Sequence, residues 1–162
     1  MDAIEMLTRQ HREMEALLEQ TLDSGRSGKT KDLFAAAADQ LTVHLASEEQ
    51  VFYPAVKAAR TEDILLESLE EHLSLKRLLA DLLLLEPSEQ TFEPKFKVLK
   101  EQAEHHHKEE EEHLFPKVGK LLDAPAREAL GRKMQEMQIA LTRGGEPREA
   151  VIDQTEEAAP LK

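Results

Sequence analysis

Two stretches of the chain carry the same pattern of histidine, glutamate, aromatic residue and proline. The first reads HLASEEQVFYP over residues 44–54, and the second reads HHKEEEEHLFP over residues 106–116. In both, a histidine and a glutamate stand four residues apart, a spacing that places two side chains one above the other on a helix. An imidazole nitrogen and a carboxylate oxygen can then reach one point. The pattern therefore favours two helices that bring paired ligands into a shared core.

The composition agrees with a helical fold and excludes several classes of site. Hydrophobic residues make up 40% of the 162 residues and aromatic residues 4%, with 6 Gly and 7 Pro, which is too little turn-forming sequence for an all-β domain. The absence of Cys excludes disulfides, thiolate metal sites, iron–sulfur clusters and cysteine nucleophiles. The net charge of −12 repels phosphate, so we expect no nucleic-acid partner.

The sequence offers no signal for export or for membrane insertion. The N-terminal residues contain acids and lack the apolar stretch of a secretory signal. The longest apolar run, over residues 78–85, is far too short to cross a bilayer. We therefore expect a cytoplasmic protein that has no membrane partner and exists as a monomer or a weak dimer.

Apolar residues recur at helical spacing in five segments. Capping residues and breakers place the expected helices at about 2–23, 31–60, 61–86, 88–122 and 124–142, the last being shorter and capped by Asp123. Four long helices with short connections predict an all-α, antiparallel up-down-up-down four-helix bundle, with the short additional C-terminal helix across one end or side. The polar residues 144–162 predict a mobile tail, which leaves one domain over residues 1–143.

Each long helix of the predicted bundle offers a histidine on its inward face. His11 and His72 take such positions on the first and third helices, beside the paired residues His44 and Glu48, and His106 and Glu110. Any one of these alone would read as an ordinary hydrogen-bonded side chain. Burying all of them in one core without a cation would be costly. Six side chains from four helices fit two ions that share carboxylates better than they fit one.

The helical register selects among the remaining histidines. Successive residues on a helix are about 100° apart, so only one of the three consecutive histidines can face the centre of the core. Counting from the apolar positions gives His106, and we expect His105 and His107 at the flank or on the surface. His113 lies one turn beyond Glu110 on the inward face. It would be a hydrogen-bond partner of a ligand or, less favoured, an additional ligand.

With these motifs the chain resembles the hemerythrin-like, or HHE cation-binding, domains over about residues 1–122. The resemblance rests on Leu7-x3-His11, on the two H-x3-E-E motifs with their prolines, and on the single His72 between them. It implies a non-haem centre of two iron ions with an oxo or hydroxo bridge, with Glu48 and Glu110 as the bridging carboxylates. The implied ligands are His11, His44, Glu48, His72, His106 and Glu110. Nitrogen and oxygen donors without sulfur leave zinc or manganese as possible substitutes.

The chain departs from the oxygen-carrying members of that family on its third helix. Those proteins have a second histidine one turn from the first, whereas the neighbours of His72 at that spacing are Ser68 and Lys76. One iron should then have an open or water-filled position. Tyr53 could fill it as a phenolate if Pro54 distorts the helix. Its five-residue offset from Glu48 otherwise makes it a packing or hydrogen-bonding residue.

These features lead to a ranked set of functions. We expect a di-iron protein that binds or senses small ligands: dioxygen, peroxide or nitric oxide. Catalase-like decomposition of peroxide as the main activity, which would make the protein an enzyme, is the alternative, together with iron storage or donation. A helical interaction module without metal is the remaining hypothesis, and it predicts melting that a chelator does not change. The sequence assigns no catalytic residue.

Overall fold

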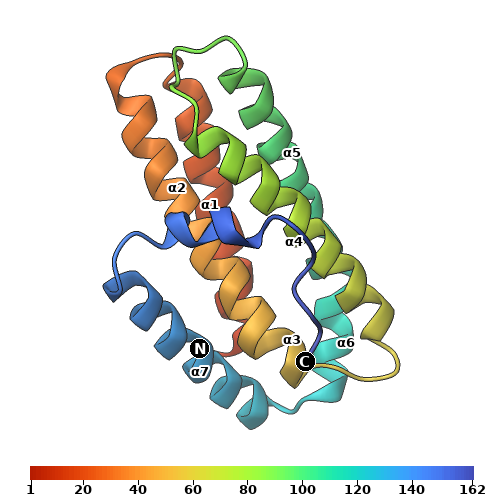
Figure 1. Ribbon diagram of the computed structural model, residues 1–162. Coiled ribbons are helices and arrows are strands. Elements are labelled where there is room, and N and C mark those ends of the chain that lie inside the picture. Colours follow the sequence, from red (N-terminus) through yellow and green to blue (C-terminus); the bar gives the residue numbers. More distant parts are fainter.

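The computed structural model describes all 162 residues as helices joined by loops, without a strand. Four long helices run antiparallel to one another: α1 (Ala3–Asp23), α2 (Gly28–Ser47), α4 (Glu62–Leu83) and α5 (Phe92–Glu109) (Figure 1). Short α3 (Tyr53–Ala55) follows α2, and α6 (Phe115–Leu121) follows α5. The additional C-terminal helix is α7 (Ala124–Arg143), which lies beside α1 and α2. The predicted four-helix bundle is confirmed.

The ends of the helices follow their capping residues. The side chain of Asp2 accepts a hydrogen bond from the backbone N–H of Glu5 at 2.9 Å, and Asp123 caps α7 in the same way through Ala126 at 3.0 Å. The second helical segment ends at Ala55, earlier than expected. No helix of the structure combines the length and the apolarity that a membrane span requires.

Each of the two repeated motifs contains a π-helical turn, at Glu48–Phe52 and at Glu110–Leu114. The backbone N–H of Tyr53 bonds to the carbonyl of Glu48, five residues back rather than four, and Phe115 bonds to Glu110 in the same way. The next residue in each repeat is a proline, which has no N–H to continue the α-helical pattern. A π turn holds more residues than an α turn. The aromatic residue five positions after each glutamate therefore returns to the face of that glutamate.

The apolar side chains form two separate cores along the bundle. The distal core fills the end with the α1–α2 and α4–α5 loops, and it includes Leu41, Leu79 and Phe96. The α7 core fills the other end, and it includes Leu7, Leu69 and Met134 of α7. The inward histidines and glutamates lie along each helix between the residues of these two cores. The bundle therefore consists of a polar layer between two apolar ones.

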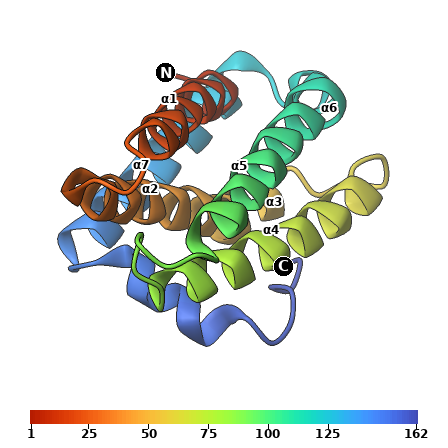
Figure 2. The same cartoon turned by 90° about the horizontal axis from the view of Figure 1, so that it is seen from above.

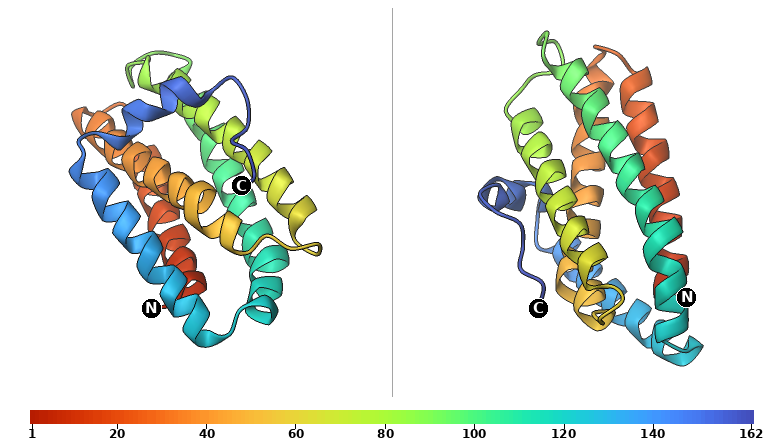
Figure 3. Two further views of the ribbon diagram at one scale, coloured as in Figure 1. Left: turned by 60° about the horizontal axis from the view of Figure 1, so that its bottom comes forward. Right: turned by 90° about the vertical axis from the view of Figure 1, so that its right-hand side faces the viewer.

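Residues 144–162 pack against the bundle, which corrects the prediction that they form a mobile tail. A 3-10 helix, Pro147–Gln154, lies across α2 and α4, which contact each other less than the other neighbouring pairs of the bundle do (Figures 1 and 2; Figure 3, left). Val151 is buried in the distal core, and Arg148 binds Asp39 through its backbone N–H at 2.9 Å and its guanidinium at 2.8 Å. Arg77 also donates to the carbonyl oxygens of Thr155 and Glu156, and these scattered contacts have no periodicity that reveals the docking in the sequence.

Candidate metal centre

The six side chains expected to bind metal lie together in the polar layer, and each is at most 2% exposed. We call this set the histidine–glutamate cluster: His11, His44, Glu48, His72, His106 and Glu110. Its ligand atoms form two groups, within each of which all atoms lie within 4.8 Å of one another. One group contains His11, His44, Glu48 and Glu110, and the other contains Glu48, His72 and His106. The two groups overlap at Glu48.

Both carboxylates stand between imidazoles of the two groups. The Oε1 atom of Glu48 lies 3.4 Å from His44 Nε2 and 3.2 Å from His72 Nε2. The Oε1 atom of Glu110 lies 3.2 Å from His11 Nε2 and 3.4 Å from His106 Nε2. An oxygen in this position can be shared between cations on its two sides. The arrangement suits a pair of ions better than a single one.

The outer nitrogen of each cluster imidazole has an acceptor of its own. The Nδ1 atoms bond to Glu111 at 2.8 Å (His11), Gln10 at 2.9 Å (His44), Glu49 at 2.8 Å (His72) and Glu71 at 2.7 Å (His106). When Nδ1–H donates to these oxygens, which is the tautomer their positions assign, Nε2 carries a lone pair directed inward. The Nε2 atoms of His72 and His106 lie 3.1 Å apart, too close for two lone pairs without a proton or a cation.

The polar atoms at the centre lack partners within the protein. No hydrogen bond reaches Nε2 of His11 and His44, either oxygen of Glu48, or Oε1 of Glu110, although all are buried. A buried polar atom without a partner costs about 1–3 kcal/mol. Cations would satisfy these atoms together, and a set of nitrogen and oxygen donors without sulfur suits iron, manganese or zinc. The residues therefore fit the two-ion centre that the resemblance implies.

The charges of the cluster oppose the effect of burial on its pKa values. Burial alone would raise the pKa of Glu48, but the imidazoles of His44 and His106 outweigh it and hold that pKa well below its usual value. Burial likewise would lower the pKa of His106, and the carboxylates of Glu110 and Glu48 instead hold it well above the usual range. In the metal-free protein these opposing effects favour an anionic Glu48 beside a protonated His106. A bound cation would take the place of that proton.

Tyr53 lies at the cluster and is fully buried. Its hydroxyl donates to Glu110 Oε2 at 2.8 Å and lies 3.1 Å from His72 Nε2. Burial raises the pKa of Tyr53 well above its usual value, and the charges of Glu110 and Glu48 raise it further. The π turn at Glu48–Phe52, next to Pro54, is a distortion of the kind that the sequence left open, and it brings Tyr53 back to the face of Glu48, where it is a hydrogen-bonding residue. Phe115 takes the matching place in the second repeat, with its ring centroid 5.9 Å from that of His11.

The other histidines of α5 and its extension correct two further expectations. His113 points outward rather than into the core: its side chain is 58% exposed and lies 3.7 Å from Glu109, because the π turn at Glu110–Leu114 rotates it away. His105 is exposed as expected. His107, expected at the flank or on the surface, is 1% exposed, and its ring stacks on that of His11 with centroids 4.0 Å apart.

Sequence reasoning missed His107 because it admitted one inward residue per turn of the fourth helix. That helix lies between α4 and α1, so two adjacent residues can face two different neighbours (Figure 2). His106 faces His72 of α4, and His107 faces His11 of α1. The run of consecutive histidines was itself the available signal.

The residues that replace the second histidine of oxygen carriers have a different role here. Lys76 is buried, and its Nζ donates to Glu49 Oε1 at 2.9 Å. The other oxygen of Glu49 accepts from His72 Nδ1. Lys76 therefore neutralises the carboxylate behind His72 rather than pointing at the cluster. Ser68 is also buried.

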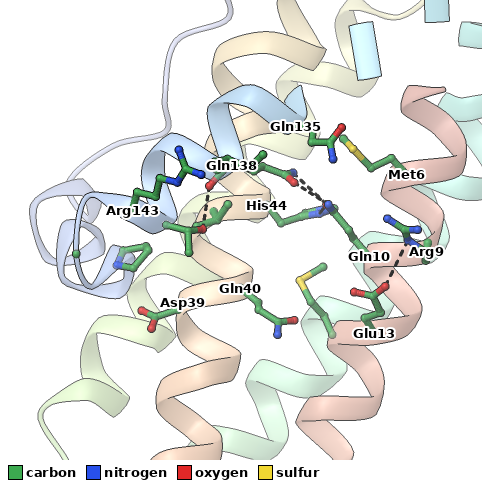
Figure 4. Close-up of a pocket in the computed structure, with 16 residues that line it drawn as sticks. Met6, Arg9, Gln10, Glu13, Asp39, Gln40, His44, Gln135, Gln138 and Arg143 are labelled. Atoms are coloured by element: carbon green, nitrogen blue, oxygen red, sulfur yellow. Dashed lines mark hydrogen bonds and ion pairs between the residues drawn. The ribbon is translucent and has the colours of Figure 1, made fainter. Parts of the chain in front are cut away.

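A cleft of about 530 Å³ between α1, α2 and α7 borders the outer edge of His44 (Figure 4). Gln10 and Gln138 line it and bond to each other at 2.7 Å, and Gln10 also holds His44 Nδ1. Gln138 reaches Ser47 Oγ at 2.9 Å. Helix α7 thus contributes to the surroundings of the cluster through Gln138, which the sequence did not predict. The cleft meets the Nδ1 side of His44, away from the cluster centre.

Comparison with known proteins agrees with this geometry. The sequence model of the hemerythrin HHE cation binding domain matches residues 2–118. A crystal structure of a hemerythrin HHE cation binding domain-containing protein from Mycobacterium kansasii has the same fold, with a TM-score of 0.79 and 23% identity, covering 94% of this chain and 98% of that one. A protein of Nostoc sp. (strain PCC 7120) named DNA nickase is 26% identical over 118 residues, 73% of this chain and 34% of that protein, so the chain spans about a third of this relative. The chain belongs to the hemerythrin HHE cation-binding domain family.

Proposed function

We propose that the chain is a non-haem di-iron protein that binds or senses dioxygen, peroxide or nitric oxide. One observation carries the proposal: Glu48 and Glu110 each place a carboxylate oxygen between imidazoles of the two donor groups. Two iron ions held by these groups would supply two one-electron steps to a small oxidising ligand. The ligand set carries no sulfur. This favours iron that changes its oxidation state over a structural zinc bound by thiolates.

The protein around the cluster favours a very small ligand. The cluster residues are almost fully buried between two apolar cores, so bulk water is excluded and charges interact more strongly than they would in water. The outer acceptors fix the orientation of each imidazole ring. The Tyr53 hydroxyl donates to Glu110 Oε2 at 2.8 Å and so holds a proton beside the centre. A molecule of a few atoms, such as dioxygen, nitric oxide or hydrogen peroxide, fits such a place better than a larger organic substrate does.

Metal content and optical spectra test the proposal. We expect the chain to take up about two ferrous ions under anaerobic conditions and to develop oxo-bridge charge-transfer bands on exposure to air. His44→Ala should lose one or both ions and the bands. His113→Ala is the matched control, because it removes a histidine that is 58% exposed and lies beside Glu109, which is neither a cluster residue nor the partner of one. Uptake of zinc in preference to iron, or of no metal, would contradict a redox role.

Catalase-like decomposition of peroxide is the second candidate, and the position of Tyr53 favours it. Dismutation of two peroxide molecules to dioxygen and water requires protons to move at the centre, and the Tyr53 hydroxyl provides a proton beside Glu110 and His72. The iron-loaded protein should then evolve dioxygen from hydrogen peroxide, and Tyr53→Phe should slow this without loss of iron. If gas evolution does not exceed that of an equal amount of free iron, binding or sensing is the better description.

A further inference from the structure

A second cleft, of about 490 Å³, lies between α4 and the segment that runs from the end of α5 into α6. Two residues of α4 carry its lining toward the cluster. Ser68 is only 4% exposed, and Glu71 accepts a hydrogen bond from His106 Nδ1 at 2.7 Å. The cleft therefore ends beside the second donor group, which consists of Glu48, His72 and His106.

Ser68 stands between this cleft and the Tyr53 hydroxyl. It precedes His72 by four residues on α4, so the two side chains lie on the same face of that helix. The Tyr53 hydroxyl is 3.1 Å from His72 Nε2. Burial and the nearby carboxylates raise the pKa of Tyr53, whereas the hydrogen-bonding hydroxyl of Ser68 lowers it, so the two hydroxyls are neighbours. A single layer of side chains, in which serine adds little bulk, thus separates the cleft from the second donor group.

The lining of the cleft carries an excess of negative charge. Four carboxylates face two ammonium groups and one exposed histidine: Glu67, Glu71, Glu109 and Glu112 against Lys117, Lys120 and His113. The Nζ atom of Lys117 donates to the backbone carbonyl of Arg60 at 3.2 Å, rather than to one of these carboxylates. A negative cleft repels anions and leaves uncharged molecules unaffected.

We propose that this cleft is the entrance through which small uncharged ligands reach the second donor group, past Ser68 and Tyr53. The inference rests on the proposed function and names its class of ligand. Dioxygen, nitric oxide and hydrogen peroxide are uncharged at neutral pH and would enter, whereas anions such as superoxide or azide would be disfavoured. The small side chain of Ser68 sets the size limit of the passage, and the carboxylates at the cleft set its charge preference.

Labelling of a single thiol tests the passage without any metal. The chain has no Cys, so Ser68→Cys places the only thiol at this point. The metal-free variant is treated separately with iodoacetamide, which is uncharged, and with iodoacetate, an anion of similar size. In both reactions the thiolate sulfur forms a bond to carbon and iodide leaves. The ratio of the two rate constants therefore does not depend on how much of the thiol is ionised.

Two further serines provide the controls. Ser47→Cys places a thiol at a position that is 0% exposed and does not line this cleft, and Ser88→Cys places one in the exposed α4–α5 loop. We expect Ser68→Cys to react with iodoacetamide at least about tenfold faster than Ser47→Cys. Its amide-to-acetate ratio should exceed that of Ser88→Cys by about threefold or more at low salt, and the difference should shrink at high salt.

Iron-loaded variants then test the same passage with the ligands themselves. Ser68→Leu fills it and should slow the spectral change caused by nitric oxide or hydrogen peroxide by at least about tenfold, at unchanged iron content. Ser68→Ala leaves it open and should match the wild type. Circular dichroism shows whether each variant folds, and the labelling of Ser68→Cys decides the matter if Ser68→Leu does not.

The outcomes separate this inference from the proposed function. Labelling of Ser68→Cys as slow as that of Ser47→Cys, or a folded Ser68→Leu that reacts as fast as the wild type, would overturn the entrance alone. An amide-to-acetate ratio equal to that of Ser88→Cys would overturn its preference for uncharged ligands. A wild-type protein that takes up no iron would overturn the proposed function with it.

Discussion

Replacing Tyr53 with phenylalanine removes one hydroxyl from the polar layer and leaves the packing of the ring unchanged. That hydroxyl is the donor to Glu110 Oε2, at 2.8 Å, and the other oxygen of Glu110 has no hydrogen-bond partner. A hydrogen bond to a charged group contributes about 1.5–3 kcal/mol. The metal-free Tyr53→Phe protein should therefore lose about 1.5–3 kcal/mol of unfolding free energy. For a chain of this size, the Tm should fall by about 3–12 °C.

The assay compares urea and thermal unfolding of the chelator-treated wild type and variant, followed by optical spectra of the iron-loaded proteins. In the metal-free protein, burial and the nearby carboxylates raise the pKa of Tyr53 and keep its hydroxyl protonated. Because this hydroxyl donates its proton in a hydrogen bond to Glu110, we expect no phenolate-to-iron absorption in the wild type and the same oxo-bridge bands in both proteins. A stability change below about 0.5 kcal/mol would refute the hydrogen-bond argument. A visible band that disappears in Tyr53→Phe would show instead that the phenolate binds iron.

Three further predictions concern the cluster and its supports. Metal affinity should fall as the pH drops, because burial lowers the pKa of His106 but the carboxylates of Glu110 and Glu48 raise it by more, so a proton competes with the ion at pH values where an ordinary histidine is already neutral. Affinity that is independent of pH, measured against a competing chelator, would argue against this. Gly131→Ala should destabilise the chain by about 1–3 kcal/mol in denaturant melts, because the added Cβ would lie 2.5 Å from the carbonyl oxygen of Met1. An unchanged unfolding midpoint would contradict the close packing of α7 on the N-terminus. Leu79→Ala in the distal core should lower the unfolding free energy by about 2–5 kcal/mol and leave the metal stoichiometry of the folded protein unchanged. Loss of metal from a variant that is folded to the same extent would show that the core also shapes the metal centre.

The parts that could be predicted from the sequence are those that depend on a regular period. Helical spacing placed the four long helices, and the same spacing brought His11, His44, His72 and His106 to one face of each. The parts that could not be predicted depend on local breaks in that period. The π turns moved Tyr53 inward and His113 outward, and nothing in the sequence except the following prolines marked them.

Contacts between elements that are far apart in the sequence could not be predicted either. His107 is inward because α5 sits between two partners, a fact of the assembled bundle rather than of one helix. The docking of residues 147–154 depends on a seam between α2 and α4 that exists only after folding. A single buried valine, Val151, was too weak a pattern to predict this docking.

The division of the bundle into two apolar ends and a buried polar middle has a consequence for how the chain unfolds. The polar middle contributes little hydrophobic stabilisation. Without cations it also holds polar atoms of the same kind close together, such as the Nε2 atoms of His72 and His106. All four long helices pass through this polar layer, so two ions bound there would cross-link all of them. After chelation, hydrogen exchange should accelerate first at the backbone amides of the polar layer, while the amides of the two apolar cores remain protected for longer.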